Sequence, residues 1–260
     1  MKMKLICSFV LLLGFSGASF ATPLLWVGDG DGTLGTVDVA TGTVNVIGQM
    51  STTMTDIAFD SSGNLYGISF YDLYAIDKTN AATTLIGSHS LGTGVKNSLV
   101  FAADGTLYAA NNALYTISTV TGASSLVGSG GVAYNSSGDL AFVGGDLFLS
   151  SASGSSDRLV KLDTATGAGT DVGSIGYSAV YGLATDNNVD LYGLAGHNVL
   201  SINTTTGAGT MLVSYSDPLL GTAYGSAFYT EAGAVPEPAT LALLGLGLAG
   251  LGFTRRRTSV

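Results

Sequence analysis

Charged residues are scarce in this chain, at 10% of its 260 residues, against about 25% in an average soluble protein. Proline occurs only four times, which excludes a collagen-like repeat and a proline-rich linker protein. The apolar fraction of 46% also excludes a charge-driven disordered polypeptide. Glycine, in contrast, is abundant at 38 residues, which favours many short strands joined by tight turns.

The single cysteine, Cys7, lies in an N-terminal segment with the pattern of a secretory signal peptide. Lys2 and Lys4 precede an apolar run over residues 5–15, and the small residues Ser19 and Ala21 end the segment. We predict a signal peptide over residues 1–21 with cleavage after Ala21, the alternative being an uncleaved anchor. The mature chain would contain no cysteine, which excludes disulfides and cysteine catalysis.

Positive charge is nearly absent between the two ends of the chain. Residues 22–234 contain four Lys or Arg side chains against 16 Asp and one Glu, which gives a formal charge of −13. A protein that neutralises phosphates needs a basic patch, so this composition argues against nucleic-acid binding. It argues equally against attraction of residues 22–234 to an anionic membrane surface.

The C-terminal residues 235–260 have a tripartite pattern. Pro236, Glu237 and Pro238 precede an apolar stretch over 239–253, and Arg255, Arg256 and Arg257 follow it. Fifteen residues make about 22 Å of helix, short of a ~30 Å hydrocarbon core. Four glycines weaken this helix further. We predict a temporary membrane segment with the arginines as a basic stop cluster on the cytoplasmic side.

This pattern resembles the PEP-CTERM sorting signal of Gram-negative bacteria that make exopolysaccharide and biofilm. The resemblance implies that Pro236, Glu237 and Pro238 form the motif recognised by an exosortase-type processing enzyme. It also implies secretion across the inner membrane, transient anchoring through residues 239–253, and removal or exchange of the tail at the cell surface. An ordinary tail anchor is the alternative. The resemblance covers about the last 25 residues and implies nothing about residues 22–234.

Residues 22–234 contain an internal repeat. A hairpin pattern, in which an Asp, Asn or Ser begins a turn that ends in Thr-Gly, recurs five times, with turn residues at 42, 80, 122, 167 and 207. Glycine supplies the positive φ that such a turn needs, and in the second copy we assign this position to Asn80. A second hairpin with a Gly- or Asn-rich tip precedes each later copy, for example over residues 56–67 and 98–109.

Four strands per period of about 41 residues indicate the blade of a β-propeller. The first period begins at Leu24 and lacks its opening strand, whereas residues 222–229 form a last strand without a hairpin. If that strand completes the first blade, the ring closes and no sheet edge is left open. We therefore predict an all-β, five-bladed propeller over residues 22–234, flanked by the signal peptide and a C-terminal hydrophobic helix.

Five aromatic residues occupy one strand position, once per period: Trp26, Tyr66, Tyr108, Phe148 and Tyr192. Aromatic side chains bury a large area between sheets, so packing between blades is one interpretation. The other is a ring of sugar-stacking platforms, similar to the one site per blade of tachylectin-type lectins.

Two further patterns suggest chemistry. Asp29 and Asp31 resemble the start of a calcium loop, but Leu34 stands where the EF-hand needs glycine, so an acidic turn is the alternative. Glycosidases need a carboxylate pair, and Glu231 is the only Glu in residues 22–234. His89 and His197 lie in different periods, away from any Cys, which argues against a histidine metal site.

These observations predict an exported cell-surface or extracellular-matrix protein with a non-enzymatic structural or interaction role, linked to exopolysaccharide and biofilm. The alternatives are a carbohydrate-binding, lectin-like propeller and a propeller glycosidase or lyase. No cofactor is expected, with calcium at Asp29 and Asp31 left open. The expected partners are the exosortase-type enzyme and extracellular polysaccharide.

Overall fold

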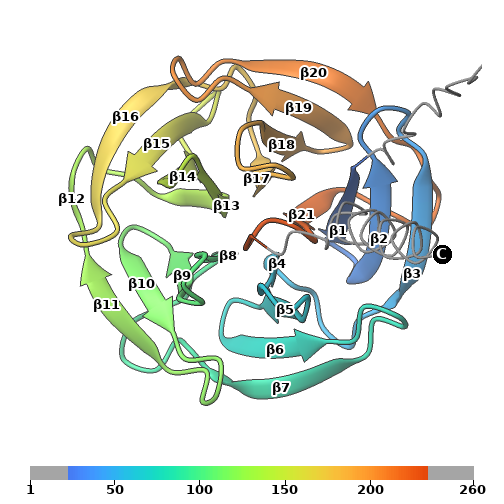
Figure 1. The fold of residues 1–260 in the computed structure, drawn as a ribbon, viewed down its shortest axis with the longest axis horizontal. Helices are drawn as coiled ribbons and strands as arrows, with labels where there is room; N and C mark the ends of the chain where they lie inside the picture. The colour runs from blue at the N-terminus through green and yellow to red at the C-terminus, as the bar shows by residue number, and fades with distance from the viewer. Residues whose placement is uncertain (1–22, 234–260) are drawn as a thin grey trace, which may run out of the picture.

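The computed structural model describes residues 23–233, which form 21 β-strands and no helix. The strands make five sheets around a central axis (Figure 1). The predicted five-bladed propeller of four-stranded blades is confirmed. The predicted signal peptide and C-terminal hydrophobic helix lie outside the described residues. Residues 23–233 contain no helix that is long and apolar enough to cross a membrane.

Each blade runs from an inner strand at the axis to an outer strand at the rim (Figure 1). Blade 1 contains β21 (Ala223–Phe228), β1 (Leu24–Asp29), β2 (Thr33–Asp38) and β3 (Val44–Gln49). Blade 2 contains β4 (Asp56–Phe59), β5 (Leu65–Ile68), β6 (Asp72–Ile76) and β7 (Thr83–Ser88). Blade 3 contains β8 (Ser98–Phe101), β9 (Leu107–Ala110), β10 (Leu114–Ile117) and β11 (Ser124–Gly128).

Blade 4 contains β13 (Ser136–Val143), β14 (Asp146–Ser151), β15 (Arg158–Leu162) and β16 (Ala168–Ser174). Blade 5 contains β17 (Val180–Ala184), β18 (Leu191–Ala195), β19 (Asn198–Ile202) and β20 (Gly209–Ser214). Blade 4 also has a fifth strand that the repeat did not predict. This two-residue strand, β12 (Gly130–Gly131), pairs in parallel with β16 and covers part of its outer edge.

The last strand of the chain closes the ring. β21 pairs antiparallel with β1, from Leu25 opposite Phe228 to Asp29 opposite Ala223, so the predicted completion of the first blade is confirmed. The pairing also places the start of β1 beside the end of β21. The two ends of the described chain therefore leave the propeller on the same face, next to the axis.

Apolar side chains fill the spaces between blades. The buried residues form five clusters, and each cluster combines residues of two neighbouring blades. The cluster between blades 1 and 2, for example, contains Leu34, Ile57 and Phe59. Because each interface depends on both neighbours, this packing stabilises the ring as one unit.

The repeated turn is stabilised by its first residue. Asp38 and Asp163 each accept backbone N–H groups two and three residues further on with Oδ1, at 2.8–3.0 Å. The turn then ends at a residue with positive φ, which is +73° at Gly42 and +75° at Gly122. The assignment of Asn80 to this position is wrong, because Ala81 has the positive φ, +64°. Counted from Asp77, Ala81 occupies the place that Gly42 has after Asp38.

The same turns hold neighbouring blades together. A Cβ on Gly122 of blade 3 would overlap the backbone of Gly87 on the outer strand of blade 2. The equivalent pairs are Gly167 with Gly128 and Gly207 with Gly173, and Gly42 meets the carbonyl of Ser214 across the closure. Glycine is needed here both for its positive φ and for the close approach of two backbones.

We expect Gly122→Ala to lower the free energy of unfolding by about 2–4 kcal/mol, because left-handed strain and a backbone overlap add together. Gly105→Ala is the matched control: Gly105 has φ +86°, but nothing lies within 4 Å of its added Cβ. That variant should lose only about 1–2 kcal/mol from backbone strain. Urea denaturation of both variants measures the difference, and equal losses would contradict the interblade contact.

Candidate functional site

The five periodic aromatic residues lie between blades. Four of them pack against a phenylalanine of the next blade, with ring centroids 5.1–5.8 Å apart. The pairs are Trp26–Phe59, Tyr66–Phe101, Tyr108–Phe142 and Tyr192–Phe228. The fifth, Phe148, lies in the apolar cluster between blades 4 and 5. Packing therefore explains their period, although Trp26, Tyr66, Tyr108 and Tyr192 keep part of their surface exposed.

Asp29 and Asp31 lie at the end of β1 and in the turn that follows it. The Asp29 carboxylate is buried and accepts the N–H groups of Asp31, Thr33 and Gly221 at 3.0, 2.6 and 2.8 Å. The last of these joins β1 to the segment before β21. The Asp29 side chain thus stabilises the ring closure, because its carboxylate accepts hydrogen bonds from the backbone on both sides of the closure. The residues that the structure describes contain no group of three or more His, Cys, Asp or Glu arranged to hold a metal ion.

The centre of the ring is occupied by two aspartates. Asp56 of β4 and Asp139 of β13 are fully buried, and their carboxyl groups hydrogen-bond to each other. Asp56 also accepts the N–H of Leu99 at 2.6 Å, and Asp139 accepts the N–H of Leu183 at 2.5 Å. Burial raises the pKa of both carboxyls well above their usual range, and Asp139 raises that of Asp56 further. Burial thus disfavours ionisation of both carboxyls together. With the hydroxyl of Ser226, which donates to Asp139 Oδ2 at 3.3 Å, the hydrogen bonds of the pair reach all five blades.

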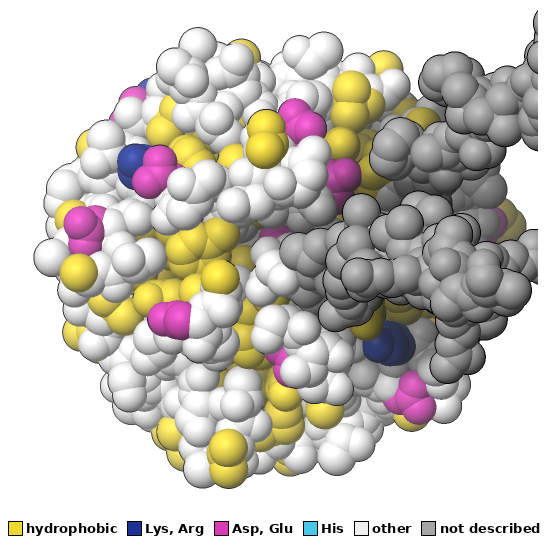
Figure 2. All heavy atoms as spheres, in the orientation of Figure 1, with side chains coloured by type: hydrophobic (Ala, Val, Ile, Leu, Met, Phe, Trp, Pro, Cys, Tyr) yellow, Lys and Arg dark blue, Asp and Glu magenta, His cyan; other side chains and the backbone are white. Residues whose placement is uncertain are grey.

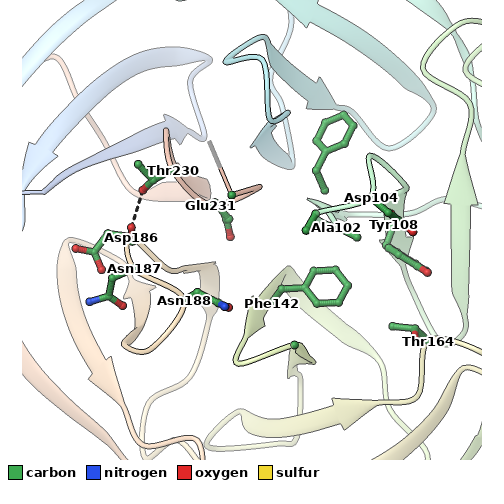
Figure 3. A pocket seen from close by; sticks show the side chains of 14 residues that line it. Ala102, Asp104, Tyr108, Phe142, Thr164, Asp186, Asn187, Asn188, Thr230 and Glu231 are labelled. Carbon is green, nitrogen blue, oxygen red and sulfur yellow. Dashed lines mark hydrogen bonds between the residues drawn. The ribbon is translucent and has the colours of Figure 1, made fainter. Parts of the chain in front are cut away.

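A cavity of about 580 Å³ opens beside this centre. Its lining comes from the loop after β8, the tight turn after β13, the loop after β17 and the segment after β21. Figure 2 shows hydrophobic side chains gathered near the middle of this face, over β9 and β13. In Figure 3, Glu231 and Asn188 lie on one side of the cavity and the rings of Phe142 and Tyr108 lie on the other.

Two carboxyl groups of this lining have an oxygen without a partner. Glu231 is 9% exposed, and its Oε2 accepts the N–H of Phe228 at 3.3 Å. Its buried Oε1 has no hydrogen-bond partner among residues 23–233, and neither has Oδ1 of Asp186. Burial raises the pKa of Glu231 well above its usual range, and Asp139 adds to the shift. Burial likewise raises the pKa of Asp186.

Asp104, on the opposite rim, is solvent-exposed and charged. Hydrogen bonds from Thr106 lower the pKa of its carboxyl. The lining residues within the described chain include no Lys, Arg or His. The cavity therefore combines an aromatic wall, a buried carboxyl with a raised pKa and a negatively charged rim.

Sequence reasoning did not predict this cavity. Glu231 was considered only as an isolated carboxylate, and Phe142, Asn187 and Asn188 were not candidates. The sequence contains one usable signal. Blade 5 has Thr185 at the position where β4, β8, β13 and β21 have Phe. The loop that follows Thr185 is also longer than the Gly144–Gly145 turn of blade 4. At such departures from the repeat, packing between blades does not by itself explain which residue is present, so these positions are candidates for a functional site.

The comparisons with known proteins bear first on the C-terminus. The PEP-CTERM protein-sorting motif matches residues 234–257, so the predicted sorting signal is confirmed. This motif implies export and sorting to the cell surface, with transient membrane anchoring. Its residues, including Pro236, Glu237, Pro238 and Arg255, Arg256 and Arg257, lie outside the described residues, as does Ala21. No curated protein matches the chain.

Solved structures share the fold at low identity. A protein of unknown function from Bacteroides thetaiotaomicron aligns with a TM-score of 0.53 and 14% identity, over 82% of this chain and 66% of that one. This chain thus spans slightly less than two thirds of that protein. A gluconolactonase from Xanthomonas campestris aligns with a TM-score of 0.51 and 16% identity, over 78% of this chain and 79% of that one. These likenesses show the propeller fold alone.

Proposed function

We propose that this chain is an exported cell-surface or extracellular-matrix protein whose propeller has a non-enzymatic interaction role linked to extracellular polysaccharide. The observation that carries the proposal is the position of the sorting motif, which starts at residue 234, directly after the closed ring. The propeller is then the part that the sorting signal delivers. An exosortase-type enzyme acting at Pro236, Glu237 and Pro238 is the proposed processing partner.

The use of the four buried aspartates supports a non-enzymatic role. Asp29, Asp56, Asp139 and Asp157 each accept a backbone N–H from another blade or from the segment next to the closure. Such carboxylates fix the positions of strands, because each one uses at least one oxygen for these backbone contacts. Catalytic carboxylates instead need an oxygen free to meet substrate.

The charge of the propeller indicates the kind of polysaccharide. Residues 22–234 carry a formal charge of −13, so an anionic polymer such as a polyuronate would be repelled. A neutral polysaccharide avoids this repulsion and binds through hydroxyl groups and apolar ring faces. We therefore propose a neutral extracellular polysaccharide as the partner.

We expect recombinant residues 22–234 to bind neutral polysaccharide saturably, in a glycan array and with the producer's own exopolysaccharide. Chelator should leave binding unchanged, because the Asp29 oxygens already accept three N–H groups. Polygalacturonate is the anionic control. Absence of binding to every neutral glycan would overturn the polysaccharide role, and loss of binding in chelator would restore the calcium interpretation.

A propeller glycosidase is the second candidate, favoured by one observation. Glu231 is a carboxylic acid with a raised pKa at a cavity that also contains Asp186, and glycoside hydrolysis needs a protonated acid next to a second carboxylate. The same binding experiment distinguishes the two. New reducing ends after incubation with neutral glycan would indicate hydrolysis, whereas an unchanged polymer supports binding alone.

A further inference from the structure

We infer that ligand binding takes place at one site per chain, the cavity between blades 3, 4 and 5, and that this site takes a neutral pyranose unit. This inference rests on the proposed function, because it names the site where the proposed polysaccharide binds. It differs from the ring of five aromatic platforms, which would give one site per blade.

The shape of the cavity fits a sugar better than the five aromatic positions do. Its volume of about 580 Å³ is within the 300–1,000 Å³ typical of small-molecule sites. Tyr108 and Phe142 form an edge-to-face pair with centroids 5.8 Å apart, and both line the cavity. The C–H face of a pyranose is apolar, so it packs against such a wall, and its hydroxyl groups then point toward the opposite side.

The opposite side contains an unfilled hydrogen-bonding position. Oε1 of Glu231 is buried and has no partner among the described residues, although buried polar atoms are nearly always hydrogen-bonded. Figure 3 shows the Glu231 side chain directed toward the space between Asn188 and Phe142. A ligand hydroxyl in this space would satisfy Glu231, with the amide of Asn188 as a second contact.

The electrostatics of the lining select for a neutral ligand. The cavity has no cationic side chain among its described lining residues, and Asp104 at its rim is charged. An anionic sugar or phosphate would find no counter-charge and would be repelled. Burial raises the pKa of Glu231, which favours its protonated form, and in that form the carboxyl can donate a hydrogen bond to a hydroxyl oxygen.

The repeat supplies a matched pair of variants for the test. Ala103 is exposed on the rim of the cavity, in the loop after β8. Ser61 is the equivalent exposed residue after β4, and it is not part of the lining. We expect Ala103→Trp to fill the cavity mouth, whereas Ser61→Trp adds the same side chain to a different blade.

Isothermal titration of residues 22–234 with cellohexaose, maltohexaose and galactan oligosaccharides tests the site. We expect one site per chain, with Ala103→Trp weakening binding at least about tenfold and Ser61→Trp leaving it unchanged. Glu231→Leu should weaken binding about tenfold, and Glu231→Gln, which keeps a donor, by less. Thermal unfolding of each variant verifies that the ring stays intact.

The outcomes separate the site from the function. Saturable binding that Ala103→Trp leaves unchanged, or a stoichiometry near five, overturns the cavity while the polysaccharide role stands. Absence of binding to the oligosaccharides and to the exopolysaccharide overturns both. Binding of polygalacturonate in place of the neutral glycans overturns the assignment of a neutral ligand.

Discussion

Deleting residues 222–233 is expected to abolish cooperative folding of the propeller. The deletion removes β21, which pairs with β1 along Leu25–Asp29 and contacts the inner strands β4 and β17. It also removes the buried residues Ala223, Ala227 and Phe228 from the spaces between blades. Blade 1 would be left with three strands and an open edge facing the axis, and an open edge of this kind favours aggregation.

The measurement is a comparison of two truncated chains by thermal unfolding and by gel filtration. A chain of residues 22–234 keeps every described strand, and it should be monomeric with one cooperative transition. A chain of residues 22–221 should lack that transition and aggregate. If the shorter chain unfolds cooperatively at a similar temperature, closure by β21 is not what stabilises the ring.

The architecture could be predicted from sequence because the same hairpin pattern occurs five times. Each copy has the same alternation of apolar and polar residues and the same turn, so a wrong interpretation of one copy does not change the predicted fold. The unpaired strands at the two ends, 24–29 and 223–228, then leave closure of a ring as the simplest way to remove open edges.

The exception was the turn of the second copy. Asn80 was the residue more tolerant of positive φ, yet Ala81 takes it at φ +64°. Ala81 is fully buried in the cluster between blades 1 and 2, so packing compensates for strain of about 1–2 kcal/mol. The tolerance of asparagine for positive φ therefore predicted the wrong residue. The spacing of four residues from Asp77, which equals that from Asp38 to Gly42, predicts Ala81.

The cavity could not be predicted because most of its lining lies in segments that do not repeat. Its lining comes from loops of three blades and from the segment after β21, and these loops differ in length and sequence. The sequence shows that an aromatic residue recurs once per blade, and this recurrence reflects packing between blades. Which of these rings also borders open space depends on the neighbouring loops. Only departures from the repeat, such as Thr185 in blade 5, give a signal for this.

The aspartate pair at the axis leads to the second large effect. We expect Asp139→Ala to lower the free energy of unfolding by about 3–5 kcal/mol, because it leaves the buried N–H groups of Leu140 and Leu183 without their acceptor. Asp139→Asn keeps one acceptor oxygen and a similar volume, so it should lose less. Urea denaturation at pH 5 measures both, and equal losses would show that the side-chain hydrogen bonds are unimportant.

The pair also predicts how stability depends on pH. Burial raises the pKa of Asp56 and Asp139, so the folded state holds protons that the unfolded state releases above about pH 4. The contribution of the pair is therefore fully present below about pH 4 and is lost as pH rises through the folded pKa values. Glu231 shifts in the same direction. The exposed turn residues Asp77 and Asp163 have the opposite effect on the pH dependence of stability, because hydrogen bonds lower their pKa. Their contribution to the free energy of unfolding is lost as pH falls through the lowered pKa values.

We expect the free energy of unfolding to fall between pH 5 and pH 8 in the unaltered propeller, and to fall less in the double variant Asp56→Asn/Asp139→Asn. The surface aspartates are the same in both proteins, so repulsion among them contributes equally to the two slopes and cancels in the comparison. Urea denaturation at both pH values measures the slopes. Parallel slopes would mean that the two buried carboxyls do not retain a proton, and the closed axis would then have to accommodate two negative charges side by side.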